Sequence, residues 1–127
     1  MFKDWQAMAA ELTGEIRSLR AGAPDVMKGF SALAQAALKS GALDTRTKEL
    51  IALAIAVATR CDGCVAFHAE AAMKQGASRE QVLETMGMAV YMGAGPSVMY
   101  AAQALEAFDQ FSAKHALAEA RGAAQAA

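Results

Sequence analysis

The amino-acid composition of this chain favours helices strongly over strands. Of its 127 residues 33 are Ala, whereas Val, Ile and Thr together account for 14, and only two residues are Pro. Ala has the highest helix propensity, and β-branched residues are the usual strand formers. With 55% apolar and 20% charged residues, the chain also has enough apolar side chains to fold. We therefore expect an all-α protein with a single domain over residues 1–127.

The charge balance and the apolar runs exclude several classes of function. Twelve Lys and Arg against 13 Asp and Glu give a net charge of −1, without the basic cluster that nucleic-acid binding requires. The longest apolar run, 50–58, has nine residues, whereas a membrane-spanning helix needs roughly 20. The first residues lack the basic-then-apolar order of a secretory signal. We expect a cytoplasmic protein that binds neither nucleic acid nor membrane.

Apolar side chains recur at steps of three and four, which predicts a small bundle of about six helices. Pro residues, an Asp44 cap and a capping box from Ser78 to Gln81 mark helix starts. We expect helices over 2–20 and 24–39, a third that begins at Asp44, a fourth that Gly76 ends, a fifth that begins at Ser78, and a sixth from Pro96 towards Phe111. The tail from about residue 114 has few large apolar side chains, so we expect it to fray.

The segment 51–58 alternates large apolar residues with Ala. Alternation is a strand pattern, but four Ala residues on one face have poor strand propensity. A helix that is apolar on every side and buried in the bundle explains the same residues. We interpret it as helix.

The motif Cys61-x-x-Cys64 followed by His68 carries most of the chemical information. On one helix these residues share a face, at i, i+3 and i+7. A helix N-terminus favours a thiolate, and His68 one turn beyond Cys64 can accept a proton. The second cysteine can capture a sulfenic acid as a disulfide. The spacing predicts a redox-active pair of thiols.

Two other interpretations of the cysteines remain open on residues alone. A zinc site would need a second pair of ligands, and His115 and the carboxylates have no matching spacing. Two buried cysteines can also act as small apolar side chains without a chemical role. The role of Glu49 also has two interpretations. Antiparallel packing of the third and fourth helices would bring its carboxylate to His68 as a proton relay. An exposed Glu49 would only complement the helix dipole.

Three segments together resemble the carboxymuconolactone decarboxylase superfamily, and more closely its alkylhydroperoxidase D-like branch. They are LDTRTKELIALA (43–54), CDGCVAFH (61–68) and KQGASREQV (74–82), which keep the order Glu, CxxC, three residues, His. The resemblance implies an all-α fold and a thiol peroxidase or disulfide oxidoreductase acting on hydroperoxides, with an external thiol reductant and no cofactor. It also implies homotrimers or homohexamers built as trimers of dimers, of which we favour the hexamer for a single-unit chain. A surplus of apolar side chains fits an oligomer.

Carried over residue by residue, the resemblance makes Glu49 and His68 the proton relay, Cys64 the attacking thiol and Cys61 its disulfide partner. The best-known peroxidases of this branch have a second His between the cysteines, where this chain has Asp62 and Gly63, which weakens the relay. The alternatives are a non-catalytic or metal-binding scaffold of the same fold and, ranked lower, a lactone decarboxylase. The decarboxylase proper lacks the cysteine pair.

Overall fold

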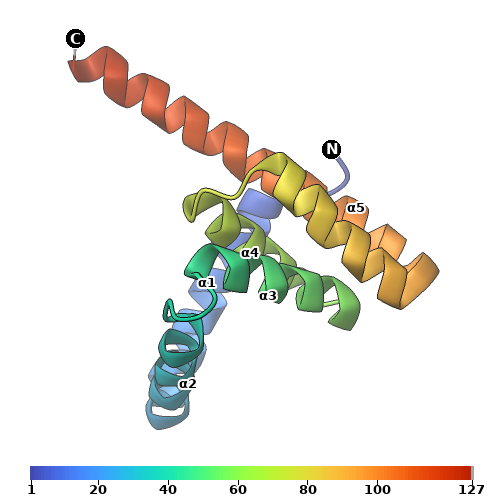
Figure 1. The fold of residues 1–127 in the computed structure, drawn as a ribbon. Coiled ribbons are helices and arrows are strands. Elements are labelled where there is room, and N and C mark those ends of the chain that lie inside the picture. The colour runs from blue at the N-terminus through green and yellow to red at the C-terminus, as the bar shows by residue number, and fades with distance from the viewer. Residues whose placement is uncertain (127) are drawn as a thin grey trace.

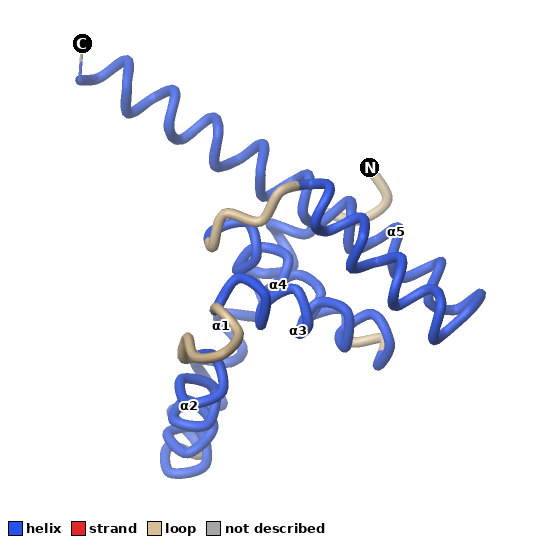
Figure 2. The backbone as a smooth tube through the Cα atoms, viewed as in Figure 1, coloured by secondary structure: helices blue, strands red, loops and turns tan. Residues whose placement is uncertain are grey.

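The computed structural model describes residues 1–126, which form five helices and no strand. The helices are α1 (Trp5–Gly22), α2 (Pro24–Leu38), α3 (Thr45–Thr59), α4 (Asp62–Lys74) and α5 (Arg79–Ala126), joined by short loops (Figure 2). The all-α prediction is confirmed, including the helical interpretation of 51–58. None of the helices in residues 1–126 is long and apolar enough to span a membrane.

Helix α5 contains both the fifth and the sixth predicted helix, which accounts for five helices in place of six. The backbone is non-helical at Ala94 (φ 52°, ψ −141°), two residues before Pro96. The two halves therefore fold back on each other, as the yellow and orange ribbons in Figure 1 show. The expected turn at 93–96 is a sharp kink inside one element. From residue 114, where we expected fraying, the Ala-rich chain stays helical to Ala126, although its side chains are exposed.

The hydrophobic core lies where α3, α4 and α5 pack against one another, and Trp5 of α1 completes it. Its largest fully buried side chains are Trp5, Leu53, Val57, Val65, Val82 and Phe111. Many other core positions are Ala, which lets the helices approach closely. The loop between α3 and α4 is thereby held by packed helices on both sides.

The hairpin of α1 and α2 projects away from this core (Figure 1). Val26, Phe30 and Leu33, which we expected to face a core, are 72%, 61% and 64% exposed. Helix α3 also differs from the expectation, because Ile51 and Ile55 are exposed and one side only is buried. An apolar face needs a partner surface to be buried, and residues 1–126 alone do not supply one here.

Candidate active site

The loop that joins α3 to α4 is two residues long, Arg60 and Cys61. Helix α3 ends with Arg60 in the left-handed conformation (φ 55°, ψ 45°). The N–H of Arg60 donates to the carbonyl of Val57 (3.2 Å), and the N–H of Cys61 donates to that of Ala56 (3.0 Å). These two bonds form a Schellman cap. They turn the chain sharply and fix where Cys61 lies.

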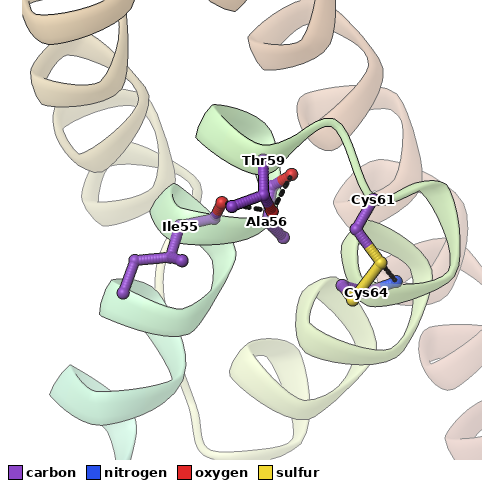
Figure 3. Close-up of a disulfide and its surroundings, with 5 residues drawn as sticks. All are labelled: Ile55, Ala56, Thr59, Cys61 and Cys64. Atoms are coloured by element: carbon purple, nitrogen blue, oxygen red, sulfur yellow. Dashed lines mark hydrogen bonds between the residues drawn. A yellow bond between two sulfur atoms is a disulfide. The ribbon is translucent and has the colours of Figure 1, made fainter.

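Cys61 also begins α4, as its N-cap residue. Its Sγ accepts a hydrogen bond from the N–H of Cys64 (3.2 Å), and the two cysteines form a disulfide with Cα atoms 5.2 Å apart (Figure 3). The motif therefore opens α4. A helix N-terminus favours negative charge, so the same position would stabilise a thiolate after reduction.

Glu49 and His68 are brought together from two helices. The His68 Nδ1 and Glu49 Oε2 atoms are 2.7 Å apart, and Glu49 is 5% exposed. The antiparallel arrangement of α3 and α4 thus makes the contact that we expected. An ionised carboxylate can only accept, so Nδ1–H donates to it and Nε2 is left free to accept a proton.

His68 follows Cys64 by one turn of α4, so both residues are on the same face of the helix. Two thirds of the His68 side chain is covered, with 33% exposed. The four predicted site residues therefore lie on α3, on α4 and in the loop between them. This arrangement can supply a thiolate and a nearby oriented base.

The position between the cysteines holds a charged pair that the sequence analysis missed. Asp62 Oδ2 lies 2.8 Å from Nζ of Lys3, which lowers the pKa of Asp62. The Asp62 carboxylate in turn raises the pKa of Tyr100. Lys3 and Asp62 are 59 residues apart, and Lys3 lies outside the motif. Gly63 lies against α1, where an added Cβ would be 2.9 Å from Cδ1 of Leu12.

A groove of about 400 Å³ lies between α3 and α5 and reaches Arg60, the neighbour of Cys61. Its lining is mostly apolar and includes Ala54, Ile55, Ala58, Met88 and Met92. His115 lies elsewhere, on the exposed end of α5, with Nε2 3.2 Å from Glu119. In the described part of the chain, no three His, Cys, Asp or Glu residues are grouped as a metal site.

Comparisons with known proteins identify the family of this chain. Residues 24–107 match the carboxymuconolactone decarboxylase family. A family protein of Legionella pneumophila is 56% identical, with a TM-score of 0.84 over 85% of this chain and 96% of that one. A Thermotoga maritima family protein, for which a role in antioxidative response has been suggested, is 25% identical, with a TM-score of 0.78 over 88% and 96% of the two chains.

An uncharacterized protein of Cupriavidus necator is 38% identical over 89% of this chain and all of its own length. An uncharacterized protein of Paracoccus denitrificans, from the cox locus, is 41% identical over 72% of this chain and 81% of its own. The chain belongs to the carboxymuconolactone decarboxylase family, and its disulfide-linked Cys61–Cys64 pair fits the CxxC motif of the alkylhydroperoxidase D-like branch.

Proposed function

We propose that this protein is a thiol-dependent peroxidase that reduces organic hydroperoxides through Cys61 and Cys64. The observation that carries the proposal is the 2.7 Å contact between buried Glu49 and His68, which follows the disulfide-linked Cys64 by one turn of α4. A buried carboxylate bonded to His keeps the ring in one orientation, with the other nitrogen free to act as the base.

The reaction starts from the reduced pair. His68 accepts the proton of Cys64, and the thiolate attacks the terminal peroxide oxygen, so that an S–O bond forms and the O–O bond breaks. The alkoxide leaves as the alcohol after taking the proton from His68. The Cys61 sulfur then attacks the sulfenic acid, forming the disulfide and releasing water. An external dithiol reductant restores both thiols by disulfide exchange.

The two cysteines differ in their surroundings, and Cys64 as the attacking thiol stays a prediction. Cys64 is one helical turn from His68, and Cys61 is nearly two. On the other hand, Cys61 Sγ receives the N–H of Cys64, which also favours a thiolate at Cys61. Chemical trapping of a sulfenic acid in Cys61→Ser and in Cys64→Ser distinguishes them: we expect it on Cys64 in the first variant and nothing in the second.

The groove beside Arg60 supports an organic substrate. Its apolar lining suits an alkyl chain, and it ends next to the residue that precedes Cys61. A cytoplasmic location, where thiols are kept reduced, suits the regeneration step.

Thiol counting tests the proposal. The fully reduced protein receives one equivalent of cumene hydroperoxide, and free thiols are counted before and after. We expect two thiols to disappear from the wild type, with the disulfide found by peptide mapping, and none from Cys64→Ser. Two unchanged thiols in the wild type would refute the peroxidase. Metal analysis of the same freshly purified sample tests the alternative of a zinc site.

The exposed apolar side chains support a homo-oligomer, a hexamer of three dimers or a trimer. They lie on α3 and α5 and include Ile51, Tyr91 and Met99. Surfaces of this kind on one chain are usually covered by another. Light scattering at micromolar concentration should give a multiple of 13.2 kDa; a single-chain mass would contradict this part of the proposal.

A further inference from the structure

The residues before α1 are fixed onto α5 by their backbone. The N–H groups of Phe2 and Lys3 donate to the two carboxylate oxygens of Glu106, at 2.7 and 2.9 Å. The side-chain amide of Gln110 donates to the carbonyl of Lys3 (2.7 Å). The segment 1–4 therefore has a defined path across α5, although it is not helical.

This path delivers the Lys3 ammonium to the loop that bears the cysteines. Nζ donates to Asp62 Oδ2 (2.8 Å) and to Gln103 Oε1 (2.7 Å). It also lies 5.3 Å from the ring centroid of Trp5 and 5.9 Å from that of Tyr100. Distances below about 6 Å are those of cation–π interactions. Contacts on several sides hold the charge in one place.

Asp62 is the first residue of α4 and directly follows Cys61. A carboxylate so close to a thiol disfavours its thiolate, because like charges repel. Lys3 is the only side chain in the described chain that forms an ion pair with Asp62. The other oxygen, Oδ1, is buried and has no hydrogen-bond partner among the described residues. Without Lys3, this carboxylate would keep the Tyr100 hydroxyl nearby but would have no ion-pair partner among the described residues.

We propose that Lys3 is a positioning residue for the cysteine pair: by pairing with Asp62 it neutralises the one carboxylate between Cys61 and Cys64 and so permits a thiolate there. The inference rests on the proposed redox use of the two cysteines. It assigns the N-terminal segment a part in the site that the CxxC motif does not indicate.

The other charged or titratable groups near the loop are few and leave this role to Lys3. Arg60 precedes Cys61 and adds positive charge, while the Glu106 carboxylate is occupied by the N–H groups of residues 2 and 3 and by Nε1 of Trp5 (2.8 Å). The remaining groups are Tyr100 on α5 and the bonded pair Glu49 and His68. None of these forms an ion pair with Asp62.

The test is a double-mutant cycle read by thiolate absorbance against pH in the reduced protein. Lys3→Met should raise the pH of half-deprotonation of the more acidic cysteine by roughly one unit, as expected for an uncompensated neighbouring charge. Asp62→Asn should lower it. In the Asp62→Asn background the ammonium of Lys3 has lost the carboxylate that holds it at the loop, so adding Lys3→Met should shift the titration less than it does in the wild type. Equal shifts in both backgrounds, or no shift in either, would overturn the inference.

Two controls separate this effect from folding and from total charge. Lys3→Arg keeps the charge and should restore the wild-type titration. Lys74→Met removes an exposed partner of Glu70 at the far end of α4, and should leave the titration unchanged. If Lys3→Met does not fold, as judged by circular dichroism, the shift in Asp62→Asn still decides: an unchanged titration there would refute the inference. Because no peroxide is used, a failed peroxidase reaction leaves this result readable by itself.

Discussion

Helices α2 and α3 have the same length, 15 residues, but they differ in how they are capped and in how much of them is buried. Helix α3 is capped by Asp44, whose side chain accepts the N–H of Thr47 (2.7 Å), and it buries Glu49, Leu53, Ala56 and Val57. Helix α2 follows Ala23, which provides no side-chain cap, and has no buried residue. An apolar period predicts a helix in both cases. Whether the helix can hold a functional carboxylate away from water depends on the surfaces around it.

Matched Leu→Ala substitutions should produce the largest difference between the two helices. Leu53 is fully buried, whereas Leu33 is 64% exposed. Leu53→Ala should lower the free energy of unfolding by about 3 kcal/mol, because it leaves a cavity, and Leu33→Ala by less than about 0.5 kcal/mol. Urea unfolding at one fixed protein concentration measures both. A comparable loss for Leu33→Ala would mean that α2 is buried in solution, and light scattering would then reveal the assembly that covers it.

Replacing an acidic residue by its amide in α3 and in α2 compares what the two helices contribute to the reaction rate. Glu49→Gln removes the charge that orients His68 and should slow the loss of thiols to hydroperoxide by about 10²-fold, the usual contribution of a positioned base. Asp25→Asn, in the first turn of α2, should leave the rate unchanged. Stopped-flow mixing of the reduced proteins gives both rates. Similar rates for Glu49→Gln and wild type would remove Glu49 from the relay.

The ends of the two helices should respond oppositely to Gly. Arg60, after α3, has a positive φ of 55° that is costly for a residue with a Cβ, whereas Lys39, after α2, has an ordinary φ of −57°. Arg60→Gly should raise the free energy of unfolding by about 1 kcal/mol, because Gly adopts this φ without strain. Lys39→Gly should lower the free energy of unfolding by between about 0.3 and about 1 kcal/mol, because Gly gives the unfolded chain more conformational freedom. Thermal unfolding checks the sign. A destabilising Arg60→Gly would show that contacts of the Arg60 side chain outweigh the strain.

Acid should weaken the start of α3 and leave the start of α2 unaffected. The hydrogen bond from Thr47 holds the pKa of Asp44 below its ordinary value of 3.8. A group with a lowered folded pKa stabilises the fold above its unfolded pKa, and this stabilisation is lost as pH falls through the folded value. Amide exchange at Thr47 should therefore quicken below about pH 4 in the wild type, relative to α2 amides. Asp44→Asn should remove that pH dependence; its persistence would assign the effect to another carboxyl group.

Local chemistry and helix period could be predicted from the sequence. The capping box forms as expected, with Gln81 N–H donating to Ser78 Oγ (3.1 Å) and Ser78 N–H to Gln81 Oε1 (2.9 Å). The Glu49–His68 contact follows from two adjacent antiparallel helices. The exposure of α2 could not be predicted, because the period of a helix does not name the surface that covers it. Nor could the Lys3–Asp62 pair, since the path of residues 1–4 depends on Glu106 and Gln110 of α5.

Cys61 serves two helices at once: its N–H completes the cap of α3 and its Sγ caps α4. The cysteine pair thus lies where hydrogen bonds to both helices hold the loop in place, with Cα atoms 5.2 Å apart. Two groups held this close react as if each were present at a very high effective molarity, far above that of a thiol free in solution. A sulfenic acid on one sulfur would meet the other before it met a second molecule of peroxide. In the proposed reaction, this geometry would protect the cysteines from irreversible oxidation.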